Sequence, residues 1–191
     1  IWTLAGEQII SRLSDDEIKA ILAHCVLIDG MAAVALTKRG FMELIGVKAS
    51  AERLLFNGEL CISDGLKCQL NISDNVPKLE LLDGARRLTS LVYYPYSGAA
   101  EHETVAPGVS LFENRFGGTV AVTAFHSGAS VYRMCNEARQ EWLFRILDSL
   151  AGERMVPCVA NRQDVMVLGA RTHSGDLLLA VFNLNYDPMQ T

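Results

Sequence analysis

The hydrophobic pattern is clearest in the first forty residues of the chain. Ser14 and Glu17 have the spacing of a capping box, in which each side chain satisfies a free N–H group at the start of a helix. Apolar positions then follow at helical spacing to about residue 24. Residues 25–28 form a continuous apolar run typical of a buried parallel strand. A second helix is expected over residues 31–39. This helix–strand–helix order predicts an α/β fold with a parallel sheet.

The second half of the chain predicts hairpins and one long helix. Residues 109–125 contain two strand-like runs around a glycine-rich turn, which indicates a β-hairpin. An apolar stripe at helical spacing predicts a helix over residues 132–150. Two final strands are expected at residues 165–168 and 177–182. Together with the helix–strand–helix order of the first forty residues, the hairpins predict a sheet that is mixed but mostly parallel.

The pattern is least regular between these two parts. In residues 49–77, short apolar groups are interrupted by turn-forming sequences such as Asn57-Gly58 and Asp64-Gly65. We therefore expect a long, partly irregular excursion there. Residues 79–94 are expected to form a strand, a short helix and a second strand.

Composition limits the classes of function. The 191 residues are 50% hydrophobic and 20% charged, as in a folded globular domain, so residues 1–191 are expected to form a single domain. The net charge of −5, without clustered Lys and Arg, argues against nucleic-acid binding. No apolar run approaches the ~18 residues of a membrane span. The five cysteines lack Cys-x-x-Cys spacing, so we expect reduced thiols and a cytoplasmic location.

No catalytic constellation is recognisable in the sequence. The expected strand-to-helix turn at Asp29-Gly30 has no Ser or Cys for a nucleophile elbow. The four histidines lack the spacing of metal ligands, and no glycine-rich phosphate-binding loop is present. We therefore expect no enzymatic activity, no cofactor and no metal site in this segment.

Two places remain as possible ligand or interface contacts. Asp29 follows the buried strand at residues 25–28, where open α/β sheets place ligands, although Asp is also a preferred N-cap of the helix that follows. Glu113, Asn114 and Arg115 form a polar group on the hairpin. They would contact a carbohydrate or another protein surface, or they would simply form the turn.

Three segments together resemble a known family of domains. They are residues 26–33 (VLIDGMAA) with 39–41 and 44–47, residues 108–122 (GVSLFENRFGGTVAV), and residues 178–188 (LLAVFNLNYDP). In this order they are similar to the amidotransferase-like domains that follow the catalytic barrel in bacterial β-galactosidases and related glycoside-hydrolase-like proteins.

The resemblance implies a flavodoxin-like three-layer α/β sandwich, a lost nucleophile and a role in trimerisation. The chain departs from the pattern because it begins after the first strands and because residues 49–77 have no counterpart. It opens on apolar Ile1 and ends just after a strand-like run, so we expect a piece from the C-terminal side of a larger protein. The expected function is a non-catalytic accessory or oligomerisation domain that self-associates. A small-molecule or carbohydrate-binding module is the alternative.

Overall fold

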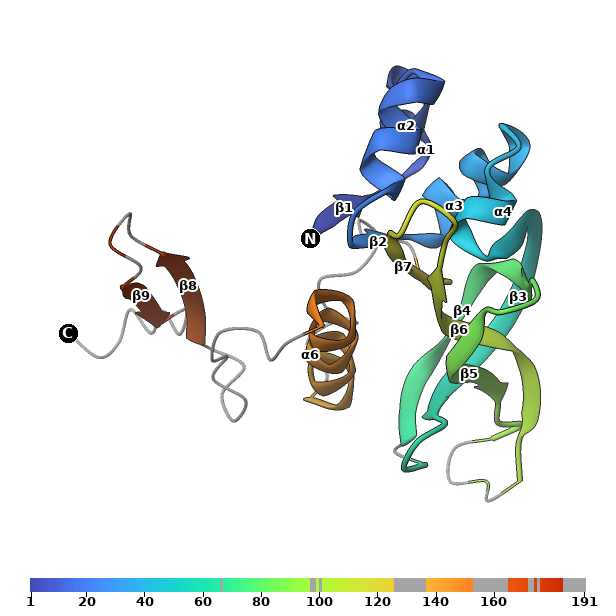
Figure 1. Cartoon of the computed structure of the whole chain (residues 1–191). Helices are drawn as coiled ribbons and strands as arrows, with labels where there is room; N and C mark the ends of the chain where they lie inside the picture. Colours follow the sequence, from blue (N-terminus) through green and yellow to red (C-terminus); the bar gives the residue numbers. More distant parts are fainter. Residues whose placement is uncertain are drawn as a thin grey trace.

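The computed structural model describes residues 1–65, 67–96, 99, 101–125, 137–152, 165–171, 174 and 176–183 (Figure 1). Helices and strands follow one another as β1 (Trp2–Leu4), α1 (Glu7–Arg12), α2 (Asp15–Leu22), β2 (Val26–Ile28), α3 (Gly30–Lys38), α4 (Met42–Ile45), β3 (Val47–Cys61), β4 (Lys67–Leu81), β5 (Arg86–Tyr93), β6 (Glu103–Glu113), β7 (Thr119–Thr123), α6 (Glu137–Ala151), β8 (Val165–Arg171) and β9 (Leu177–Asn183).

A seven-stranded mixed sheet organises the chain, in the order β1-β2-β7-β6-β5-β3-β4, and β8 and β9 form a separate antiparallel pair. The α/β class and the mixed sheet are thus confirmed. The expectation of a mostly parallel sheet is wrong, because only β1–β2 and β2–β7 are parallel and the other four pairs of this sheet are antiparallel. The chain between β3 and β4 and between β6 and β7 is too short for the crossover that a parallel pair requires.

The strands of the sheet place alternate side chains in two different hydrophobic clusters. Val26, Ile28 and Val122 belong to the larger cluster, which includes residues of α1–α4. Ala121 belongs to a second cluster with Ile146 and Leu150 of α6. Because successive strand side chains point to opposite faces, the two clusters lie on opposite sides of the sheet. Of the helix expected at residues 132–150, residues 132–136 lie outside the described part, and the three-layer sandwich stays a prediction.

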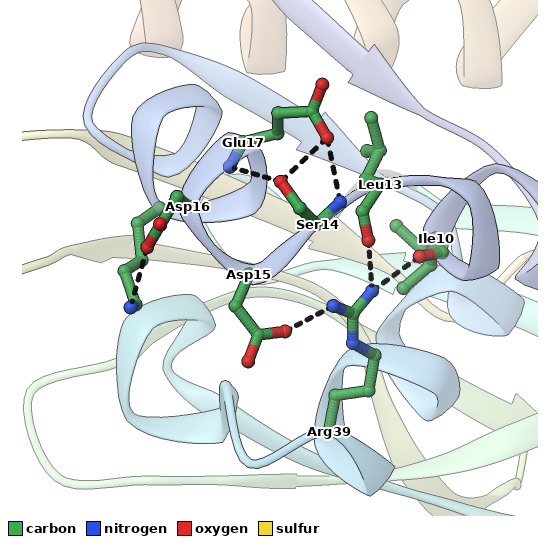
Figure 2. A network of polar contacts seen from close by, with 8 residues as sticks. Ile10, Leu13, Ser14, Asp15, Asp16, Glu17 and Arg39 are labelled. Carbon is green, nitrogen blue, oxygen red and sulfur yellow. Dashed lines mark hydrogen bonds and ion pairs between the residues drawn. The ribbon is translucent and has the colours of Figure 1, made fainter.

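Two groups of polar contacts stabilise the first helices, one at the start of α2 and one between α3 and the α1–α2 junction (Figure 2). The predicted capping box is confirmed: Glu17 N donates to Ser14 Oγ at 3.3 Å, and Ser14 N donates to a Glu17 carboxylate oxygen at 2.8 Å. From the C-terminus of α3, Arg39 donates to the carbonyl oxygens of Ile10 (2.6 Å) and Leu13 (2.7 Å) and pairs with Asp15. These contacts attach the α1–α2 junction to α3 and so fix the layer that covers β1 and β2.

The irregular excursion expected for residues 49–77 is wrong, because most of this segment belongs to the long hairpin of β3 and β4. The sequence Asn57-Gly58 forms no turn. It lies within β3 at a register shift, where the Asn57 side chain donates to Tyr94 O and accepts from Tyr94 N, both at 2.7 Å. A Cβ on Gly58 would lie 2.6 Å from the Tyr94 ring. The Gly allows this close approach rather than a turn.

The short helix expected within residues 79–94 is also absent from the structure of that segment. Residues 82–85 form a tight turn between β4 and β5, in which Ala85 N donates to Leu82 O at 3.1 Å. The two strands on either side of this turn are confirmed. The hairpin of β6 and β7 and the β8–β9 pair also form as the sequence predicts. None of the helices in the described part of the chain has both the length and the hydropathy needed to cross a membrane.

Candidate functional site

The two groups of residues predicted as contacts lie at opposite ends of the neighbouring strands β2 and β7. Asp29 follows the C-terminal end of β2, whereas residues 113–115 lie at the turn that precedes β7. Because β2 and β7 are parallel and Val26 pairs with Val120, this turn lies beside the N-terminal end of β2. The structure therefore does not bring Asp29 together with Glu113, Asn114 and Arg115.

Asp29 is a buried helix cap with a second hydrogen bond to a distant segment. Its Oδ1 accepts from Ala32 N at 2.8 Å, which caps α3, and from Gly6 N at 2.9 Å. The side chain is 4% exposed. Gly6 has a φ of 79° and stands at the N-cap of α1, so Asp29 fixes the junction of β1 and α1 to the start of α3. The alternative of an N-cap is confirmed, and a ligand contact of Asp29 stays a prediction.

Asn114 uses its amide to join three segments. Its Nδ2 donates to Leu22 O at 2.7 Å and to Leu44 O at 3.1 Å. Leu22 is the last residue of α2, and Leu44 is the last but one of α4. Its Oδ1 accepts from the backbone N–H groups of Phe116 (2.9 Å) and Gly118 (3.2 Å). All these bonds are internal and the residue is buried, so Asn114 shapes the turn and holds two helix ends against it.

The neighbours of Asn114 face solvent instead. Glu113 and Arg115 are exposed, and the Arg115 guanidinium lies 5.4 Å from the centre of the Phe116 ring. Phe116 is itself exposed, so this cation–π pair is of the weaker, solvated kind. The two charged side chains are accessible to a partner or ligand, and their role in binding stays a prediction.

A cavity of about 400 Å³ lies where α6 meets the ends of β3 and β5, a place that the sequence did not indicate. This size is in the range of small-molecule sites. Apolar groups and guanidinium groups line it together: Cys61, Ile62, Ser63, Arg86, Arg87, Leu88, Thr89, Trp142, Arg145, Ile146 and Ser149.

A β-bulge lies in β5 where this strand borders the cavity. Arg87 pairs with Ser110 and Thr89 pairs with the adjacent Val109, so Leu88 is an extra residue on β5. In a regular strand, alternate side chains would point to opposite faces. A bulge bends the strand and redirects its side chains. The bulge therefore changes the alternation at Leu88 and Thr89, whereas Arg86 and Arg87 pair in regular succession with Leu111 and Ser110.

Arg145 connects α6 to the β3–β4 turn beside the cavity. Its Nη1 donates to Asp64 Oδ2 at 2.6 Å, and its Nη2 pairs with Glu141 one helical turn away. The hydrogen bonds to Asp64 and then to Glu141 raise the pKa of the Arg145 guanidinium above its usual value. Arg86 and Arg87, by contrast, form no ion pair with any residue in the described ranges.

Two buried polar groups lie next to the cavity lining. The hydroxyl of Thr89 donates to Glu59 Oε1, and a Cβ on Gly108 would lie 2.5 Å from that hydroxyl oxygen, so the Gly makes room for the pair. Trp142 is 4% exposed. Its indole Nε1 has no hydrogen-bond acceptor within the part of the chain that the structure describes.

Sequence reasoning missed this cavity because its walls come from three segments about twenty to fifty residues apart. Arg86-Arg87 is visible as a basic pair and Trp142 as a member of an apolar stripe, but nothing in the sequence indicates that they meet. A bulge, which leaves no fixed sequence signature here, interrupts β5 immediately after Arg87.

At the opposite edge of the sheet, β1 has β2 as its only neighbour among the described strands. Trp2 N donates to Cys25 O at 2.8 Å, and Leu4 O accepts from Asp29 N at 3.0 Å. Because backbone groups of a strand alternate in direction, the N–H and C=O of Thr3 point away from β2, toward the open edge. Trp2 is 53% exposed beside this edge.

No group of three or more His, Cys, Asp or Glu suited to a metal ion occurs within the described ranges. Comparison of the sequence with protein-family models and with curated proteins found no match.

Proposed function

We propose that the chain is a non-catalytic accessory domain of a larger glycoside-hydrolase-like protein, and that it self-associates through the open edge of β1. The domain would be a cytoplasmic three-layer α/β sandwich. The open edge of β1 is the observation that carries this proposal. The resemblance to trimerising domains supports it; it rests on residues 26–33 with 39–41 and 44–47, on residues 108–122 and on residues 178–188.

Two features of the open edge favour pairing with another strand: its backbone hydrogen-bonding groups and its exposed apolar side chains. The backbone groups of Thr3, which have no partner strand among the described residues, can continue the hydrogen-bond ladder, as those of unprotected edge strands do. Within and next to the same strand, Ile1 (50% exposed) and Trp2 (53%) are large apolar side chains in contact with solvent. A second copy presents the same combination, so the surface is self-complementary, as a two-fold interface requires.

The shortness of β1 determines which contact matters most. Three residues form only a few ladder hydrogen bonds, and each contributes about 0.5–1.5 kcal/mol net. Burial of an exposed Trp contributes more, because a large aromatic removes the most apolar area from water. We therefore expect Trp2 to be the main contributor to the interface.

Sedimentation velocity over a range of concentrations tests the assembly. The wild-type chain is expected to form a dimer or trimer that dissociates on dilution, and Trp2→Asp is expected to raise the dissociation constant at least about tenfold, because it places a charge in the apolar contact. Tyr96→Asp is the matched control, since Tyr96 is an exposed aromatic (68%) outside the β1 edge. A monomer at all concentrations, or equal weakening by both variants, would contradict the proposal.

The second candidate function is a small-molecule or carbohydrate-binding module, and the cavity below α6 favours it. Such a module would be monomeric. It would gain about 2.7 kcal/mol of stability at a ligand concentration one hundred times the dissociation constant. A sugar-dependent rise of the melting temperature that is lost on changing Arg86 or Arg87 would place the carbohydrate in this cavity. Loss on changing Asp29, or on changing Glu113 or Arg115, would instead place it at one of the two separate positions predicted from the sequence.

A further inference from the structure

We propose that the cavity between α6 and the ends of β3 and β5 binds a small organic anion, with a carboxylate or phosphate group on an apolar or aromatic body. This inference does not depend on assembly through β1, which lies at the other end of the sheet order. It rests on the chemistry of the cavity walls and on the two arginines without ion-pair partners in the described ranges.

The walls divide into an apolar part and a cationic part. Ile62, Leu88 and Ile146 provide aliphatic surface, and Trp142 adds an aromatic ring. A ligand that only carried charge would leave this surface without a partner. A ligand body with an apolar or aromatic face would remove it from water, which contributes roughly 25 cal/mol per Å² of apolar area.

Arg86 and Arg87 select the charge of the ligand. The acidic groups near the cavity are already engaged: Asp64 and Glu141 by Arg145, and Glu59 by the Thr89 hydroxyl. The guanidinium groups of Arg86 and Arg87 keep their donors available within the described structure. Planar guanidinium groups bind carboxylate and phosphate through two parallel hydrogen bonds. An anionic group at the mouth of the cavity would therefore meet guanidinium donors among the lining residues.

Trp142 is the natural reporter of occupancy. The chain has two tryptophans, so in a Trp2→Phe background Trp142 is the only one. Its ring lines the cavity and its indole N–H has no acceptor among the described residues. A bound ring or anion would change the surroundings of the indole and hence its fluorescence.

The experiment titrates the Trp2→Phe protein with four probes: phenyl phosphate, benzoate, phenol and inorganic phosphate. Phenyl phosphate, benzoate or both are expected to change Trp142 fluorescence saturably and to raise the melting temperature. Phenol and inorganic phosphate, which lack one half of the proposed chemistry, are expected to bind at least about tenfold more weakly. The two anionic arms distinguish a phosphate from a carboxylate ligand.

Arg86→Ala and Arg87→Ala are each expected to weaken binding about tenfold or more, since each removes a charge-assisted hydrogen bond. Arg12→Ala is the matched control, because Arg12 is an exposed arginine on α1. If either alanine variant fails to fold, Arg86→Lys and Arg87→Lys keep the charge, and loss of the forked donor alone should still weaken binding.

Saturable binding that follows this order supports the proposal. Absence of binding by both aryl anions, equal binding of phenol, equal binding of inorganic phosphate, or equal effects of the Arg12 and cavity variants would overturn it.

Discussion

At the scale of single residues, short polar side chains replace missing backbone partners between distant segments. Asn57 pairs with the backbone of Tyr94, Asp29 holds Gly6 and Ala32, and Asn114 joins the ends of α2 and α4 to a turn. Buried backbone groups need such partners, since an unsatisfied group costs free energy on burial. Asn and Asp are used here because their side chains resemble the peptide group in size and in hydrogen-bonding atoms.

Asn114 gives a prediction at this scale. In Asn114→Ala, the carbonyls of Leu22 and Leu44 and the N–H groups of Phe116 and Gly118 lose a partner. At about 1 kcal/mol for each of these four hydrogen bonds, the free energy of unfolding should fall by roughly 4 kcal/mol. Denaturant melts measure this loss. The adjacent, exposed Arg115→Ala should change stability by no more than about 0.5 kcal/mol, and a similarly small effect for Asn114→Ala would show that the turn does not depend on it.

At the scale of elements, local signals fix where helices begin and end but do not fix how strands pair. The capping box starts α2, Asp29 starts α3, and Gly40 with a φ of 82° follows the end of α3. Each of these depends on residues within one turn of the helix. The β3–β4 hairpin, in contrast, contains a register shift between Phe56 and Gly58, where the Asn57 side chain bonds to the backbone of Tyr94, the residue after β5.

The capping box predicts a cost at the start of α2. Ser14→Ala removes the hydroxyl that accepts from Glu17 N, and such a cap contributes about 1 kcal/mol. Amide hydrogen exchange should therefore become faster in residues 15–22, with a matching loss of stability in denaturant. Ser11→Ala is the control, since the Ser11 hydroxyl bonds only to Gln8 O among the described residues. Exchange in α2 that is unchanged by Ser14→Ala would disprove the capping role.

The same box should respond to acid through Glu17. The hydrogen bond from the Ser14 backbone N–H, and then that from its hydroxyl, lower the pKa of Glu17 below its ordinary value of 4.5. The folded state therefore favours the ionised carboxylate. Its contribution is present above pH 4.5 and is lost as the pH falls through the lowered pKa. Glu17→Gln should remove this acid-dependent part, so the stability difference between the variant and the wild type should shrink below that pH.

At the scale of the whole molecule, the sheet has a parallel end and an antiparallel end. Strands β1, β2 and β7 make the parallel end and β3–β6 the antiparallel end, and α1–α4 share the larger cluster with residues from both ends (Figure 1). The α6 helix packs on the other side of the sheet through the second cluster, and Arg145 attaches it to the β3–β4 turn. Docking of α6 therefore links strands from both ends and also creates the cavity.

Docking of α6 depends on Trp142. Trp142→Ala should lower the free energy of unfolding by roughly 3–5 kcal/mol, as for other buried aromatic side chains. Denaturant melts again provide the measurement, with Trp2→Ala as the control of the same residue type at an exposed position. Trp2→Ala should cost about 0.5 kcal/mol or less. A loss below about 1 kcal/mol for Trp142→Ala would mean that α6 is not held by this face.

The sequence by itself determined the local elements of this protein: the caps of α2 and α3, the buried strand β2, the β6–β7 hairpin and the apolar stripe of α6. These signals are local because a helix end or a tight turn is decided by residues close in the chain. Only the tertiary structure decided that the sheet is mostly antiparallel, that residues 49–77 mostly belong to long strands, and that Arg86, Arg87 and Trp142 line one cavity. Strand pairing and cavity walls depend on contacts between segments far apart in sequence, and such contacts leave no fixed spacing from which they can be predicted.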